Sequence, residues 1–287
     1  MRLETRAPGK INVCLFLGPT REDGRHELVS IMQSVTLADR LRLEDGDGDG
    51  ADAVDCPGVE GVNLVATAVA RFRAATGWAG DPVRISVDKR IPVAAGMAGG
   101  SADAGAALRL LARASGIEDR DLLHEIATGL GADVPAQVRP GRVLATGAGE
   151  RIERVPGVPR YGVLVVPSAG ALLTADVFRE ADRLGLARDA AGLATALQEV
   201  RDGLPDLPDA LCVNELEPAA LSLRPELSDT LERVRDAGAD VAMVSGSGPT
   251  VLGLFHDVKA AKAARERFPG AKVAKPVGPH GGEVLAA

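Results

Sequence analysis

The feature that most constrains the fold is a glycine-rich segment, residues 92–104 (PVAAGMAGGSADA), between two strongly patterned stretches. Apolar residues alternate at positions 83, 85 and 87, which predicts a strand just before the segment. Alanine and leucine dominate residues 101–115, which predicts a helix just after it. A strand, a glycine turn and a helix N-terminus in this order present backbone N–H groups to which an anion can bind.

The residues of this segment alone allow two interpretations. Ser101 stands where an N-cap residue is expected, so the segment can be a cradle for a polyphosphate or only a turn between a strand and a helix. The patterns of a Walker A loop and of a Rossmann glycine fingerprint are both absent from it. Asp103 stands where a nucleophile elbow around Ser101 would need glycine.

The composition excludes several classes of protein. Hydrophobic residues make up 46% and aromatic residues 2%, so the core is expected to be aliphatic. The net charge of −7 argues against a nucleic-acid or anionic-membrane partner but leaves room for a local basic pocket. Cys14, Cys56 and Cys212 are far apart and indicate neither a disulfide framework nor a zinc site. Without a signal-peptide pattern or a long apolar run, we expect a cytoplasmic protein.

Strand and helix patterns are mixed along the chain without regular alternation, which predicts an α+β fold. The acidic, glycine-rich run at 44–55 is expected to be a solvated loop. A boundary is expected near the RVPGVPR stretch, giving domains at 1–155 and 156–287. The expected strands are 11–17, 83–87, 161–166, 241–244, 250–255 and 271–277. The expected helices are 63–76, 101–115, 122–130, 174–184, 190–200, 227–237 and 258–267.

The glycine-rich segment resembles the second motif of the GHMP kinases, a superfamily of small-molecule kinases. The matching residues are Pro92, Gly96, Met97, Gly99, Gly100 and Ser101, with Ala98 where a further glycine is common. APGKINV at 7–13 is similar to the first motif of that family, and SGSGPTVLGLF at 245–255 to the third. Because the three motifs occur in order across most of the chain, the sequence is identified as a member of this family.

The resemblance implies two α+β domains with the active site in the cleft between them. It implies ATP as phosphate donor, Mg²⁺ accompanying the nucleotide, a small-molecule acceptor and a monomer or homodimer. Three further strings are similar to those of members that phosphorylate the 2-hydroxyl of 4-diphosphocytidyl-2-C-methyl-D-erythritol, an isoprenoid precursor. These strings are DGRHEL at 23–28, GADVPAQV at 131–138 and VNELEP at 213–218.

The resemblance also assigns the catalytic residues. Lys10 would stabilise the negative charge of the transferring phosphoryl group and favour ionisation of a nearby acid. Asp133 would accept the proton of the substrate hydroxyl as general base. The alternatives are a surface lysine and an aspartate that only caps a helix or a turn.

The nucleotide contacts implied by the resemblance are Asn63 and Lys89 on the adenosine side and the residues of the glycine-rich loop. The loop residues are Pro92, Val93, Ala94, Ala95, Gly96, Met97, Ala98, Gly99, Gly100, Ser101 and Ala102. Asp103 has no role in this scheme, because a carboxylate near a helix N-terminus suits the helix dipole but repels a triphosphate.

The implied substrate contacts are Asn12, Arg25, His26, Thr174, Phe178, Gly246 and Ser247. Arg25 departs from the family pattern, which has an aromatic residue there to stack on cytosine. A guanidinium can stack on a base as well, so we expect Arg25 to replace that ring, with Phe178 as the opposite wall. The alternative is that Arg25 points to solvent and His26 alone holds the base. The alternatives are a mevalonate-type kinase of the same family, and a non-catalytic nucleotide-binding protein on the same fold.

Overall fold

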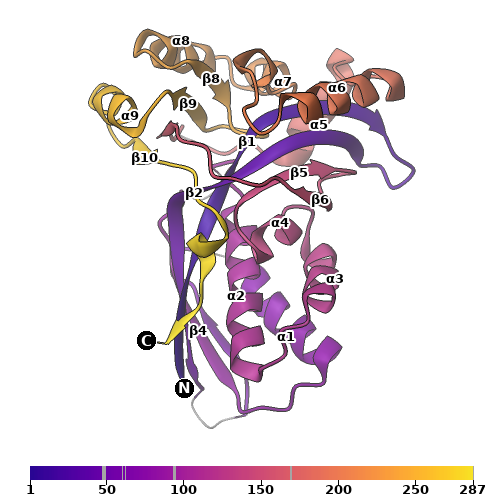
Figure 1. Ribbon diagram of the computed structural model, residues 1–287, viewed down its shortest axis with the longest axis vertical. Helices are drawn as coiled ribbons and strands as arrows, with labels where there is room; N and C mark the ends of the chain where they lie inside the picture. Colours follow the sequence, from indigo (N-terminus) through magenta and orange to yellow (C-terminus); the bar gives the residue numbers. More distant parts are fainter. Residues whose placement is uncertain (47–49, 60, 62, 93–94, 169, 287) are drawn as a thin grey trace.

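Two β-sheets with helices packed against them form the protein (Figure 1). The structure, a computed structural model, describes residues 1–46, 50–59, 61, 63–92, 95–168 and 170–286. The first sheet has the order β11-β1-β2-β4-β3, with β5 paired to β2 and β6 to β5; the second has the order β10-β7-β9-β8. The strands are β1 (Arg2–Thr20), β2 (His26–Asp45), β3 (Ala53–Asp55), β4 (Val83–Asp88), β5 (Arg142–Thr146), β6 (Arg151–Arg154), β7 (Gly162–Val166), β8 (Val241–Val244), β9 (Val251–Phe255), β10 (Lys272–Ala274) and β11 (Leu285–Ala286).

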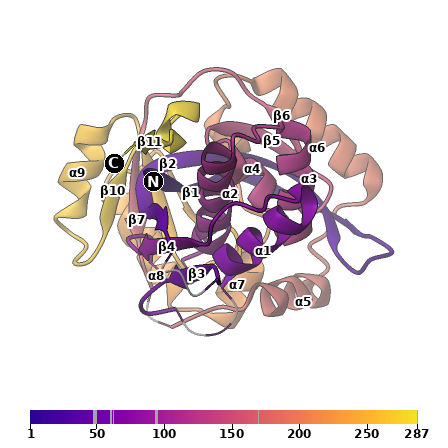
Figure 2. The same cartoon turned by 90° about the horizontal axis from the view of Figure 1, so that it is seen from below.

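Helices cover both sheets. Figures 1 and 2 show α1 to α4 gathered on one side of β1, β2 and β4, where α2 packs against both long strands. The remaining α-helices belong to the part of the chain that contains the second sheet. The α-helices are α1 (Leu64–Thr76), α2 (Gly99–Ser115), α3 (Arg120–Leu130), α4 (Val134–Val138), α5 (Thr174–Leu184), α6 (Ala190–Gly203), α7 (Glu217–Leu223), α8 (Leu227–Asp236) and α9 (Val258–Arg265), and two short 3-10 turns are η1 (Asp209–Leu211) and η2 (Pro279–Gly282).

A long antiparallel hairpin of β1 and β2 runs through both halves of the molecule (Figure 1). Its pairing register shifts between Pro8 and Lys10, between Asn12 and Cys14, and again near the tip. Proline has no N–H to donate to a ladder, and register shifts re-aim side chains. The first two of these irregularities flank Lys10 and Asn12, and both residues line one cavity of the protein.

The α+β prediction is confirmed, and most expected elements are present. The helix at 174–184 and the strand at 241–244 are found with the expected bounds. The sequence missed β2, β5, β6 and the short helices α4 and α7. The expected loop at 44–55 was wrong at its ends, because β2 extends to Asp45 and 53–55 form β3; residues 47–49 lie outside the described residues.

The two sheets divide the chain near the expected boundary, but the division is not clean. β6 ends at Arg154 and β7 begins at Gly162. One hydrophobic cluster nevertheless joins residues of both halves, among them Ile11, Phe16, Val163 and Leu252. Strand β11 returns to pair with the start of β1, so the two termini lie side by side. We therefore keep domains at 1–155 and 156–287 as a proposal, with β11 as part of the first sheet.

Candidate active site

A cavity of about 570 Å³ brings together residues of all three motifs. The expected site residues that line it are Lys10, Asn12, Asn63, Lys89, Pro92, Ala95, Gly96, Ala98, Gly99, Gly100, Asp133, Thr174, Phe178, Gly246 and Ser247. Met97, Ser101, Ala102, Arg25 and His26 are outside this lining. Val93 and Ala94 lie outside the described residues.

Lys10 and Asp133 both line this cavity and lie close to each other. The Nζ atom of Lys10, a buried residue, lies 3.7 Å from a carboxylate oxygen of Asp133 and donates a hydrogen bond of 2.8 Å to Asn12. Asp133 occupies the N-cap position of α4, but its side chain makes no capping hydrogen bond. Its carboxylate is 31% exposed and faces the lysine, so the alternative of a purely structural cap is not supported.

A chain of hydrogen bonds holds the lysine in place. The Asn12 side chain donates to Ser30 Oγ at 2.7 Å, and Ser30 Oγ donates to the carbonyl of Cys14 at 2.6 Å. With its amide oriented in this way, Asn12 presents its oxygen to the lysine. Ser30 carries this arrangement from β2 and was missed, because nothing in its sequence context marks it. Asn12 is therefore placed to orient Lys10, besides lining the cavity as a candidate substrate contact.

The glycine-rich loop ends at the N-terminus of α2. The helix begins at Gly99 with Ala98 as N-cap, so the expectation that Ser101 caps the helix was wrong. Ala98 adopts a left-handed conformation with φ 52° and ψ 41°, which turns the chain into the helix. The first N–H groups of a helix have no intrahelical acceptor. Those at 99–101 can therefore bind the phosphates of a ligand.

Gly96 joins this loop to the third motif. Its φ is +66°, and a Cβ atom there would lie 2.1 Å from the carbonyl oxygen of Ser245. Ser245 Oγ also donates to the carbonyl of Gly96 at 3.2 Å. The third motif thus supports the phosphate loop directly, and only glycine fits at this contact.

Met97 and the first turn of α2 have structural rather than lining positions. Met97 is buried, and its carbonyl accepts a hydrogen bond of 3.0 Å from the backbone N–H of Lys10. Ser101 and Ala102 belong to the first turn of α2, and neither residue lines the cavity. Any contact from Met97 or Ser101 to a nucleotide would therefore come through the backbone, as expected for a loop that binds phosphate with N–H groups.

A buried ionic triad lies beside the loop. Lys89 Nζ contacts Asp39 at 2.5 Å and Asp103 at 2.7 Å. Asp39 also accepts hydrogen bonds from the backbone N–H groups of Arg90 and Ile91. Asp39 was missed by sequence reasoning, because it lies in a strand outside every motif.

The triad perturbs the pKa values of its members. Burial raises the pKa of Asp103 to about 7, against the attraction of Lys89 and with the repulsion of Asp39. Burial alone would lower the pKa of Lys89, but the two carboxylates outweigh it and raise this pKa. One oxygen of Asp103 has no hydrogen-bond partner among the described residues. The repulsion expected between Asp103 and a triphosphate is therefore reduced by Lys89.

Asn63, at the same end of the cavity, is the N-cap of α1 and accepts a hydrogen bond of 2.8 Å from Val65 N–H. It lies with Cys56, Val59 and Leu64 in the lining, so this end combines apolar surface with a few polar groups. Pockets for small molecules and cofactors commonly have this combination.

The opposite end of the cavity is formed by the third motif and α5. Thr174 Oγ1 and Ser247 Oγ are 3.0 Å apart, and Gly246 has a left-handed φ of 56°. A Cβ atom at Gly246 would lie 3.3 Å from the Asn12 side-chain oxygen and 3.7 Å from Lys10 Nζ, so this turn approaches Lys10 closely. Phe178 and Leu173 add apolar walls.

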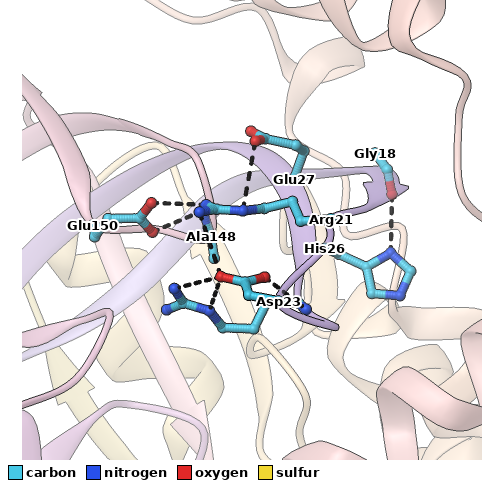
Figure 3. Close-up of polar contacts among 8 residues, drawn as sticks. Gly18, Arg21, Asp23, His26, Glu27, Ala148 and Glu150 are labelled. Atoms are coloured by element: carbon cyan, nitrogen blue, oxygen red, sulfur yellow. Dashed lines mark hydrogen bonds and ion pairs between the residues drawn. The ribbon is translucent and has the colours of Figure 1, made fainter.

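His26 lies behind Phe178, with ring centroids 5.4 Å apart. Its Nδ1 donates to the carbonyl of Gly18 at 2.9 Å (Figure 3). Its Nε2 lies 3.0 Å from a carboxylate oxygen of Asp182. The ring is buried. For His26 to contact a substrate directly, Nε2 would have to leave Asp182; as the structure stands, His26 supports Phe178.

Arg25 is turned away from the cavity, contrary to the expectation that it stacks on a base. Its guanidinium makes two hydrogen bonds to one oxygen of Asp23, at 3.0 and 2.8 Å, and is 53% exposed. The pair forms because Asp23 and Arg25 flank the same tight turn. Figure 3 shows the neighbouring Arg21 between Glu150 and Asp23, which ties the hairpin tip to the β5–β6 turn.

Comparison with known proteins assigns the chain to a family. The model of the GHMP kinases N terminal domain matches residues 63–141, and that of the GHMP kinases C terminal matches residues 190–274. The chain therefore belongs to the GHMP kinases, which are ATP-dependent kinases of small molecules.

Particular relatives narrow the comparison. The chain is 40% identical over 274 residues to the 4-diphosphocytidyl-2-C-methyl-D-erythritol kinase of Anaeromyxobacter sp. (strain Fw109-5), covering 92% of this chain and 86% of the relative. It is 42% identical over 272 residues to the enzyme of the same name from Streptomyces coelicolor, covering 91% and 90%. A crystal structure of 4-(cytidine 5'-diphospho)-2C-methyl-D-erythritol kinase superposes with a TM-score of 0.79 at 31% identity, covering 96% of this chain and 100% of that one.

Proposed function

We propose that this protein transfers the γ-phosphate of ATP to the 2-hydroxyl of 4-diphosphocytidyl-2-C-methyl-D-erythritol, a step that supplies isoprenoid precursors without mevalonate. The observation that carries the chemistry is the Lys10–Asp133 contact of 3.7 Å inside a cavity that also contains the phosphate loop. The substrate assignment is supported by relatives of that name at about 40% identity over most of the chain.

The proposal gives a task to each part of the cavity. The N-terminus of α2 would hold the phosphates of ATP, with the nucleoside toward Asn63 and Lys89. Asp133 would accept the proton of the attacking hydroxyl, and Lys10 would stabilise charge on the transferring phosphoryl group. The apolar walls at Leu173 and Phe178 would receive the pyrimidine, and the turn at Gly246 would face the diphosphate of the substrate.

Magnesium would be bound mainly by the nucleotide. Among the described residues, no cluster of three His, Cys, Asp or Glu side chains is positioned to hold a metal ion. Mg²⁺ usually binds through substrate phosphates with one or two carboxylates, so the phosphates of the nucleotide would supply most of its ligands. The ion would neutralise phosphate charge, while Lys10 and Asp133 keep the roles given above.

A cytoplasmic location is part of the proposal, as is a monomer or homodimer. Within the described ranges, no helix has the length and apolar character needed to cross a bilayer. The net charge of −7 agrees with a small-molecule partner rather than nucleic acid.

A substrate panel tests the proposal. The purified protein is incubated with ATP, Mg²⁺ and one acceptor at a time: the cytidylyl substrate, mevalonate, phosphomevalonate, homoserine or galactose. We expect ADP formation that depends on the cytidylyl substrate, with at least about 100-fold lower kcat/KM for the others, since a buried recognition site discriminates strongly against ligands that leave it unpaired. Preference for mevalonate, or no turnover with any acceptor, would overturn it.

A further inference from the structure

A second cavity, of about 650 Å³, lies away from the active site and is strongly basic. Its lining residues come from the first part of β1, the middle of β2, the residue after Lys89, and α9 with β10. These helices and strands are labelled in Figure 1. The basic residues in its lining are Arg6, Arg40, Arg90, Lys262, Arg265 and Lys272, against a single acidic residue, Glu266, in the same lining. This concentration of positive charge occurs in a chain whose net charge is −7.

Ion pairing does not account for most of the cations in this basic cavity. Arg90 pairs with Asp88, and Arg265 donates to the carbonyl of Ala271. Among the described residues, no acidic side chain lies within ion-pair distance of Arg6, Arg40, Lys262 or Lys272. Lys262 and Arg265 lie in the last turn of α9, where the helix dipole favours a cation. That effect accounts for these two residues but not for the arginines on the strands.

Arg6 and Arg40 carry the inference, because they are direct cross-strand partners in the β1–β2 pair. The partner of Arg40 on its other side, Asp88 of β4, forms its ion pair with Arg90 at 2.8 Å instead. Like charges placed opposite each other on neighbouring strands destabilise a sheet. A local arrangement that opposes folding without a compensating contact is a sign of a binding function. An anion between the two guanidinium groups would turn this repulsion into two attractive contacts.

The shape of the basic cavity indicates a small ligand rather than a nucleic acid. The cavity is a hollow at the junction of the two sheets, closed on one side where Thr36 N–H bonds the carbonyl of Lys275 at 2.9 Å. Leu37 and Val273 give it an apolar wall beside the cations. Its volume falls within the range of sites for small organic molecules.

We propose that this basic cavity is a second ligand site, which binds an organic diphosphate through Arg6, Arg40 and the cations of α9 and β10. The two phosphates lie between the strand arginines and Lys262, and the organic part lies on Leu37 and Val273. The site shares β2 with the active site: Asp39, between Ala38 and Arg40, belongs to the opposite face of the strand and contacts Lys89.

Calorimetric titration with inorganic pyrophosphate, without divalent ions or nucleotide, is compared between the parent and the variants below, so that binding to the basic cavity is the part that substitutions in this cavity remove. We expect saturable binding of one pyrophosphate that weakens as salt is added. In Arg40→Glu/Lys262→Glu we expect the dissociation constant to rise roughly 30-fold or more, because two charge-assisted contacts are reversed. The matched control, Arg113→Glu/Arg120→Glu, makes the same change in net charge on α2 and α3 and should bind like the parent. Equal losses in both double variants, or no binding to the parent, would overturn the proposal.

Two further measurements separate a ligand site from a structural role. Arg6→Glu replaces the like-charge pair with an attractive one, so we expect its Tm to rise by about 1–3 °C while pyrophosphate binding is lost. A lower Tm would mean that Arg6 serves the fold. The KM for ATP should stay within about twofold in every variant, since none of these residues lines the active-site cavity. If a polyglutamate peptide binds through these residues and pyrophosphate does not, the proposal is wrong, and the partner of this cavity is an acidic protein segment rather than a small ligand.

Discussion

Replacing Ala98 by glycine should stabilise the protein. Ala98 is the only non-glycine residue with positive φ in the described part of the chain, at φ 52°. The left-handed conformation costs an L-residue roughly 1–2 kcal/mol, and glycine adopts it freely. Glycine also increases the entropy of the unfolded chain, which opposes the gain by about 0.4–1 kcal/mol. The net expectation is a gain of about 0.5–1 kcal/mol in the free energy of unfolding.

Thermal unfolding followed by calorimetry, with ATP kinetics in parallel, measures this effect. A gain of that size should raise the Tm by about 1–4 °C in a chain of this length. The matched control is Ala263→Gly, at an exposed position inside α9, where glycine should instead cost about 1 kcal/mol. The KM for ATP should not rise in Ala98→Gly, because the loop offers N–H groups rather than the alanine methyl. If both substitutions lower the Tm equally, Ala98 is not strained.

Three further predictions follow from particular contacts. Gly96→Ala should destabilise by about 2–4 kcal/mol in urea unfolding, because its Cβ would overlap a carbonyl of the third motif. Gly100→Ala should be tolerated, because its Cβ would meet only the Leu64 side chain, at an ordinary contact distance of 3.8 Å. The pKa of Asp103 is raised to about 7, so the folded protein binds this proton more tightly than the unfolded chain does. The resulting contribution to the free energy of unfolding is fully present below the ordinary pKa of 3.8 and is lost as the pH rises through 7. Asp103→Asn should therefore show a flatter pH dependence of the free energy of unfolding between about pH 4 and 8, and an unchanged slope would contradict the buried titration. Arg25→Ala should alter the KM for the cytidylyl substrate less than about twofold, since its guanidinium is held outside the cavity; a tenfold rise would show that Arg25 swings in to reach the base.

Much of the fold could be predicted because its signals are local. The strand at β8 and the helix at α5 have patterns contained in their own residues, and their bounds were predicted correctly. Strand β2 was missed because much of its length is buried on both faces, which removes the alternation that marks a half-exposed strand. The pairing of β11 with β1 joins residues at opposite ends of the chain, so no local pattern could indicate it.

The site was predicted by resemblance more than by pattern. No spacing rule joins Lys10 to Asp133; the family motifs placed them together, and the structure puts their charged groups 3.7 Å apart. The start of α2 was misplaced because Ser101 is a good N-cap, while the residue that turns the chain is a left-handed alanine. Asp39 and Ser30 act through tertiary contacts, which a single sequence does not reveal.

The most direct test of the central claim is the kcat of Asp133→Asn with the cytidylyl substrate. Loss of a general base should lower kcat by roughly 10²- to 10⁴-fold, with the KM values and the Tm little changed because the side chains have the same shape. The matched control is Asp119→Asn, the same substitution at a helix N-cap whose side chain only accepts capping hydrogen bonds, and it should keep full activity. If Asp133→Asn retains a kcat near that of the parent, Asp133 is not the base and the proposed mechanism is wrong.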